Sequence, residues 1–200
     1  MNLANKLTVF RMILVIIMMI IPFLNLQGSI YGISIICIVI DLIFIIASIT
    51  DKLDGYIARS RKQITTFGKF LDPIADKILV IVAMIILVEM NKIPFWIPAI
   101  VIIREFLVSG YRLVAVEKSG EVIAASIWGK IKTATQMVGI ALVFIDRNPF
   151  GAFFNMNLYG YDLLFNIIIT ILLSLSVVAT VFSGIDYLKG CKQLFKDELK

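Results

Sequence analysis

Two short stretches of the chain combine four carboxylates with small residues at helical spacing. The residues concerned are Asp51, Asp54, Gly55, Ala58 and Arg59 in the first stretch, and Gly68, Asp72 and Asp76 in the second. At about 100° per residue, the acids and small residues of each stretch fall on one helix face. Small residues allow two membrane helices to approach closely. The pattern therefore predicts four carboxylates converging on two divalent cations about 4 Å apart, as in a site for phosphoryl transfer.

The other residue types leave few alternative chemistries. The chain has no histidine and two cysteines, Cys37 in an apolar stretch and Cys191 near the end of the sequence. Serine-histidine and cysteine-histidine catalysis are therefore excluded, and a disulfide framework or a structural zinc site is not expected. Oxygen ligands remain, and these select hard cations such as Mg²⁺ or Mn²⁺.

The same acids could instead form the polar ends of two membrane helices. Their order on one face of each helix, and the cost of holding acids at membrane depth, favour a functional site. Pro73 adds a question about the second helix, since an interior proline removes a backbone hydrogen bond. Either Pro73 kinks this helix, or Asp72 lies close to its start.

The elements that must position these acids are membrane helices. The chain is 60% hydrophobic and has a mean hydropathy of +0.98, which predicts an all-α integral membrane protein with one domain over residues 1–200. Six membrane-spanning helices are expected as a bundle at residues 7–26, 31–57, 67–90, 94–117, 124–145 and 161–187. The 20-residue separation of Asp51 from Tyr31 corresponds to about 30 Å of helix, which places Asp51 at the edge of the hydrocarbon.

Basic residues indicate the orientation of this bundle. All but two of the 19 lysines and arginines fall on the side of the acidic stretches, the exceptions being Lys92 and Arg147. The positive-inside rule then predicts that both termini and the active site face the cytoplasm. The net charge of +5 suits anionic membrane lipids and phosphate-bearing ligands, and no nucleic acid partner is expected because a soluble basic domain is absent.

Four basic residues that follow the acids could bind a phosphate group: Arg104, Arg112, Lys130 and Lys132. Arg104 lies well inside an expected span and could instead form an internal pair with Glu105. The other three could instead extend towards the membrane surface.

Two further groups of polar residues are open to more than one interpretation. Asp41 is about 15 Å of helix from Asp51, too far for the metal site, and is expected to be a buried, hydrogen-bonded acid, with a dimer contact as the alternative. Asn5, Thr8 and Arg11 have helical spacing. They could line the phosphate pocket or form a plain interfacial segment.

The acidic pattern resembles the signature of the CDP-alcohol phosphatidyltransferase family at all eight positions from Asp51 to Asp76. Arg104, Glu105 and residues 120–126 and 128–133 resemble the bacterial branch that uses sn-glycerol 3-phosphate. The resemblance implies transfer of a phosphatidyl group from CDP-diacylglycerol to sn-glycerol 3-phosphate, with release of CMP. It also implies a homodimer in the bacterial cytoplasmic membrane.

The resemblance further implies a role for each residue of the pattern. Asp51, Asp54 and Asp72 would be metal ligands, and Asp76 would complete the metal site and act as the catalytic base. The CDP-lipid positions would be Asp51, Gly55, Ala58, Arg59 and Gly68. A relative that uses inositol phosphate, serine or phosphatidylglycerol would share these residues. A divalent-cation transporter is an alternative from another class, although the acids cluster at one membrane face rather than along a path.

Overall fold

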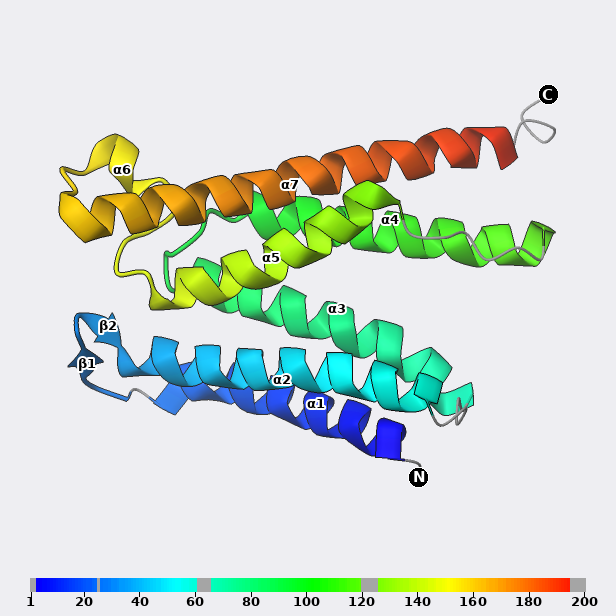
Figure 1. The fold of residues 1–200 in the computed structure, drawn as a ribbon, viewed down its shortest axis with the longest axis horizontal. Coiled ribbons are helices and arrows are strands. Elements are labelled where there is room, and N and C mark those ends of the chain that lie inside the picture. Colours follow the sequence, from blue (N-terminus) through cyan, green and yellow to red (C-terminus); the bar gives the residue numbers. More distant parts are fainter. Residues whose placement is uncertain (1–2, 25, 61–65, 120–125, 195–200) are drawn as a thin grey trace.

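The computed structural model describes residues 3–24, 26–60, 66–119 and 126–194, with side chains for residues 5–24, 26–51, 71, 73–115 and 126–189. Six long helices form a bundle (Figure 1). They are α1 (Leu3–Ile20), α2 (Ile35–Ser60), α3 (Thr66–Glu89), α4 (Trp96–Ser119), α5 (Ile127–Ile145) and α7 (Gly160–Leu194). A 3-10 turn, η1 (Ile21–Leu24), follows α1, and one helical turn, α6 (Ala152–Asn155), precedes α7.

The bundle has two distinct ends. Helix α1 packs along α2 and α3, α5 packs between α2 and α7, and α4 contacts α3 and α7. Figure 1 shows α1 beginning and α7 ending at the same end, which we call the terminal end. The strands and α6 lie at the other end, which we call the hairpin end. Because α2 ends and α3 begins at the terminal end, both acidic stretches lie there.

The six expected spans each correspond to one long helix, but three of them differ clearly in their bounds. Helix α1 begins at Leu3 and ends at Ile20 instead of spanning 7–26, and α7 continues to Leu194 instead of ending at 187. The third difference is at the start of α2. The strands β1 (Ser29–Ile30) and β2 (Ile33–Ser34) pair as a short antiparallel hairpin. Tyr31 and Gly32 have φ angles of 51° and 80°, as a two-residue type I′ turn requires. Helix α2 therefore begins at Ile35, not at residue 31, because the turn occupies the expected helix start.

Pro73 lies in the interior of α3. The helix begins at Thr66, so Asp72 is not at a helix start. Of the two arrangements that the sequence left open, the one with a helix beginning near Asp72 is wrong.

The outer surface of the bundle is apolar. Large side chains such as Phe106, Leu113 and Ile103 have exposed fractions of 71%, 72% and 60%, whereas Phe44 and Phe144 pack in the core with ring centroids 6.5 Å apart. Extensive exposed apolar surface marks contact with lipid or another protein. Among the described residues, Asn5–Leu24 and Gly160–Lys189 form helices long and apolar enough to cross a membrane. These features are consistent with an all-helical membrane protein, while six spans remain a prediction.

A hydrogen-bonded network closes the hairpin end. Asp146 is 2% exposed; its carboxylate accepts hydrogen bonds from the Asn166 amide and the Asn148 backbone N–H, both at 2.9 Å. The Lys92 ammonium donates to the backbone carbonyl of Asp146. Lys92 and Arg147, the two exceptions in the charge distribution, therefore lie together at this end.

Asp41 is buried in α2, as expected from the sequence. The expectation of a hydrogen-bonded acid does not hold for its Oδ1 atom, which has no hydrogen-bond partner among the described residues.

Candidate active site

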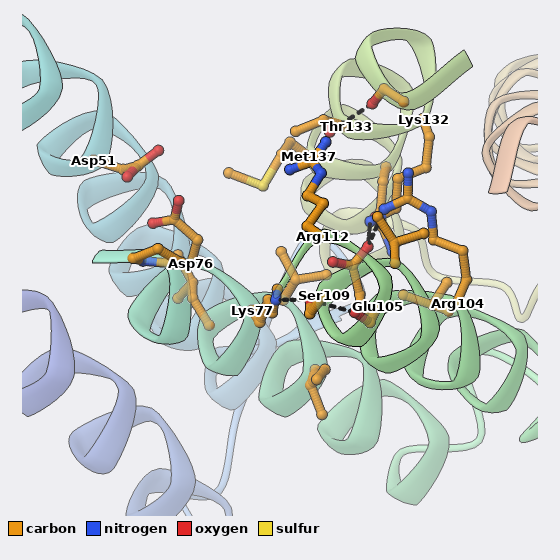
Figure 2. Close-up of a pocket in the computed structure, with 18 residues that line it drawn as sticks. Asp51, Asp76, Lys77, Arg104, Glu105, Ser109, Arg112, Lys132, Thr133 and Met137 are labelled. Carbon is orange, nitrogen blue, oxygen red and sulfur yellow. Dashed lines mark hydrogen bonds and ion pairs between the residues drawn. The ribbon is translucent and has the colours of Figure 1, made fainter. Parts of the chain in front are cut away.

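A cavity of about 330 Å³ lies between α2, α3, α4 and α5. Its charged lining residues are Asp51, Asp76, Lys77, Arg104, Glu105, Arg112 and Lys132. Figure 2 shows Asp51 and Asp76 on one side of this cavity, with Arg104, Glu105 and Lys132 across from them. The cavity thus has an acidic side, built by α2 and α3, and a basic side, built mainly by α4 and α5.

On the acidic side, the first and the last acid of the pattern lie together. The Arg11 Nη1 atom, from α1, is 2.8 Å from Asp51 Oδ1 and also donates to Asp76 Oδ1. The Arg11 side chain is 0% exposed, whereas Asp51 and Asp76 are 33% and 48% exposed and both line the cavity. Among the residues with described side chains, Arg11 is thus a buried cation shared by Asp51 and Asp76, and Asn5 and Thr8 of the same helix are also buried. A plain interfacial segment is therefore the wrong interpretation of these three residues.

The rest of the acidic pattern belongs to α2 and α3, but its side chains lie outside the described residues. These positions are Asp54, Gly55, Ala58, Arg59, Gly68 and Asp72. Where side chains are described, no group of three histidine, cysteine or acidic residues gathers. The two-metal site and the nucleotide site therefore stay predictions.

On the basic side, Glu105 pairs with two cations. Its Oε1 atom accepts from Arg104 Nη1 at 2.9 Å and from Lys132 Nζ at 2.6 Å, and the Arg104 Nη2 atom donates to Ser183 Oγ. All three charged side chains are nearly buried. The internal pair considered for Arg104 is therefore present. Lys132 does not extend to the membrane surface, because the same carboxylate holds it inside.

Two more cations complete this side. The Arg112 Nη2 atom donates to the Tyr187 hydroxyl at 2.5 Å, and the Tyr187 ring lies 5.3 Å from Arg112 Cζ and 5.8 Å from Arg104 Cζ. Lys77 donates to Ser109 Oγ. Four cations therefore face the cavity beside one carboxylate, which leaves a positive surplus suited to a phosphate group.

Lys130 differs from the other predicted phosphate ligands. Its side chain is exposed and does not line the cavity. The helical spacing explains this difference, since residues two apart on a helix point in different directions. The structure thus brings Arg104, Arg112 and Lys132 together and leaves Lys130 outside.

The start of α5 allows Arg104 to pack closely. Ser126 caps this helix by accepting a hydrogen bond from the Gly129 backbone N–H at 3.1 Å. A Cβ atom at Gly129 would lie 3.3 Å from Arg104 Nη2. Because that separation is tight for a carbon atom, glycine leaves the space that the guanidinium occupies.

Sequence reasoning did not assign Lys77, Ser109 or Tyr187 to the site. Lys77 follows Asp76 directly, so its nearness to the predicted base was the available signal. Tyr187 is 75 positions from Arg112, and no local pattern in the sequence connects the two.

Comparisons with known proteins identify the family of the chain. The family model described as CDP-alcohol phosphatidyltransferase matches residues 1–182, and the chain belongs to this family. It is 45% identical to the CDP-diacylglycerol--glycerol-3-phosphate 3-phosphatidyltransferase of Bacillus subtilis over 74% of this chain and 79% of that protein. The Haemophilus influenzae protein of the same name is 36% identical over 100% of this chain and 98% of its own length. A probable phosphatidylglycerophosphate synthase of Mycobacterium tuberculosis is 34% identical over 93% of this chain and 79% of that protein.

Proposed function

We propose that this chain transfers the phosphatidyl group of CDP-diacylglycerol to sn-glycerol 3-phosphate, giving phosphatidylglycerophosphate and CMP. The observation that carries the proposal is one cavity with a carboxylate pair on one side and a surplus of cations on the other. The names of relatives that align along most of this chain support the same reaction.

The acidic side fits a pair of divalent cations, because Asp51 and Asp76 offer only carboxylate oxygens and the chain has no histidine. We assign Asp51, Asp54, Asp72 and Asp76 as the residues that hold two Mg²⁺ or Mn²⁺ ions. When bound, such ions neutralise a diphosphate and stabilise its leaving oxygen. Asp76 removes the proton from the attacking hydroxyl. Its exposure to the cavity gives an incoming hydroxyl access to the carboxylate.

In this proposal, one of these acids and four residues near them bind the CDP-lipid. They are Asp51, Gly55, Ala58, Arg59 and Gly68. The Arg59 guanidinium has the charge and the planar fork that suit a phosphate.

The basic side binds the phosphate of the acceptor. Arg112 and Lys77 each have a neutral hydrogen-bond partner, so their charges remain available to an anion. Arg104 and Lys132 share the Glu105 carboxylate and add one net positive charge. A phosphate held there leaves the acceptor hydroxyl free to extend across the cavity to Asp76.

We also propose that the six long helices span the bacterial cytoplasmic membrane as a homodimer, with the terminal end in the cytoplasm. The position of Lys92 and Arg147 at the hairpin end supports this orientation through the positive-inside rule. Anionic lipids would contact the basic terminal end.

A product assay with purified protein tests the reaction. The protein, in detergent, receives CDP-diacylglycerol and Mg²⁺ with one acceptor at a time: sn-glycerol 3-phosphate, glycerol, serine, inositol phosphate or phosphatidylglycerol. We expect CMP and phosphatidylglycerophosphate with sn-glycerol 3-phosphate and little product with glycerol. A higher product yield with another acceptor would indicate that the chain is a family member that uses that acceptor. Lack of CMP release with every acceptor, together with Mn²⁺ uptake into proteoliposomes, would favour the transporter.

A further inference from the structure

Arg11 joins three helices at the acidic side of the cavity. Its guanidinium extends from α1 and contacts Asp51 of α2 and Asp76 of α3 through the same nitrogen, Nη1. The side chain is 0% exposed, so its charge is far less screened than that of a surface arginine. Two acids of the predicted metal site therefore already share a cation that the protein itself supplies.

The same carboxylate oxygens are the ones that a hard divalent cation would use. A divalent cation that binds Asp51 and Asp76 therefore enters next to a guanidinium of the same sign. Repulsion between like charges in a poorly screened site disfavours both being held closely. Without any cation, however, the two carboxylates would repel each other across the α2–α3 contact.

We propose that Arg11 is a positioning residue that serves as the resident counter-ion of the metal site. Its guanidinium keeps Asp51 and Asp76 together while no metal is bound, and it competes with a divalent cation for their negative charge. Arg11 thus sets the metal concentration at which the site fills. This inference rests on the proposed function, because it requires a divalent cation at these acids.

A purely supporting role for Arg11 predicts the opposite effect on metal binding. Residues that orient metal ligands from outside typically cost about 10 to 100-fold in metal affinity when they are removed. Removal of a competing counter-ion instead tightens metal binding, although it destabilises the metal-free protein. The two roles therefore differ in the sign of one measured quantity.

The test compares full-length wild type with Arg11→Met, Arg11→Lys and the control Arg147→Met. Methionine keeps a long side chain without charge, and Arg147 is half-exposed at the hairpin end, so its replacement removes one positive charge far from the site. Mn²⁺ affinity is measured from free Mn²⁺ by electron paramagnetic resonance. Thermal unfolding is measured in EDTA and in Mg²⁺.

We expect Arg11→Met to unfold at a lower temperature than wild type in EDTA, to bind Mn²⁺ more tightly, and to gain more thermal stability from Mg²⁺. Arg147→Met should match wild type in metal affinity. Arg11→Lys keeps the charge without the fork, so its Mn²⁺ affinity should stay near that of wild type. Weaker Mn²⁺ binding by Arg11→Met overturns the inference, as does unchanged binding.

Arg11→Lys decides the question if Arg11→Met does not fold. A 10-fold or larger loss of Mn²⁺ affinity in Arg11→Lys, on the scale of a lost supporting residue, would also contradict a counter-ion role. Wild type that binds no Mn²⁺ contradicts the metal site of the proposed function instead, so the two failures can be told apart.

Discussion

The two ends of the bundle both contain acidic side chains with partners inside the protein, but the partners differ in kind. At the hairpin end, Asp146 receives hydrogen bonds from an amide and a backbone N–H, and it does not line the active-site cavity. At the terminal end, Asp51, Asp76 and Glu105 pair with cations around an open cavity. Both carboxylate oxygens of Asp146 accept hydrogen bonds from neutral donors of the protein, so this network is structural. A charged pair that lines a cavity can instead give up one of its partners when a ligand of the same charge binds.

This difference between the two ends indicates that the hairpin end contributes to stability and the terminal end to activity. A network that is complete within the protein contributes to folding and has no capacity left for a substrate. The basic side of the cavity has more cations than acids, so part of its charge is available to an anion. Substitutions at the two ends should therefore affect different measurements.

The largest effect is expected from Asp76→Asn. Asparagine keeps the shape and one oxygen but cannot accept a proton, so turnover should fall by about 10² to 10⁴-fold. Binding of CDP-diacylglycerol, measured with radiolabelled lipid, should largely remain. The control is Asp162→Asn, a half-exposed acid at the hairpin end, which should keep wild-type turnover. If Asp76→Asn turns over at nearly the wild-type rate, Asp76 is not the base.

The second largest effect is expected from a substitution on the basic side of the cavity. Arg112→Ala removes a cavity-lining charge and should raise the KM for sn-glycerol 3-phosphate by about 10 to 150-fold, the scale of 1.5 to 3 kcal/mol for a charge-assisted contact. The KM for CDP-diacylglycerol should change much less. Lys130→Ala, which removes an exposed charge outside the cavity, is the matched control. Equal effects of the two variants would contradict the placement of the acceptor phosphate.

At the hairpin end, Asp146→Ala should lower stability without affecting the reaction. It removes the acceptor of the Asn148 N–H and one of the two acceptors of the Asn166 amide, which also donates to the Pro149 carbonyl. This loss costs about 1 to 3 kcal/mol of unfolding free energy. Denaturant unfolding in mixed micelles measures this loss, with Asp162→Ala as the control. The turnover of the folded fraction should equal that of wild type. If folded Asp146→Ala protein turns over more slowly than wild type, the hairpin end does not contribute to stability alone, and the comparison of the two ends is wrong.

The smallest effect, and one of opposite sign, is expected at Asp41. Since its Oδ1 atom is buried without a partner in the described structure, Asp41→Leu should raise the unfolding free energy by about 1 kcal/mol. The same micelle unfolding assay measures it. A destabilised variant would indicate that the carboxylate gains its partner from a second copy of the chain, and cross-linking of the two proteins would then show a weaker dimer.

The sequence predicted the helices well because apolar length and periodicity are strong, local signals. Its main errors lay at boundaries, such as the start of α2, where a tight turn replaced the first residues of an apolar run. The acids could be found because four of them share spacing with glycines. The role of Tyr187 could not, because its contact with Arg112 depends on how α7 packs against α4. Glu105 was considered as part of the resemblance and as a partner of Arg104, and its second pair, with Lys132, depends on packing.

The buried arginine of α1 has a consequence for how the protein enters a membrane. Helix α1 contains no acidic residue, so Arg11 meets its counter-charges only after α2 and α3 have been synthesised. An arginine within an isolated membrane helix costs about 2.5 to 3.5 kcal/mol on the insertion scale, and its long side chain favours a position near the surface. We therefore expect α1 to reach its final depth in the membrane only after α3 has been inserted.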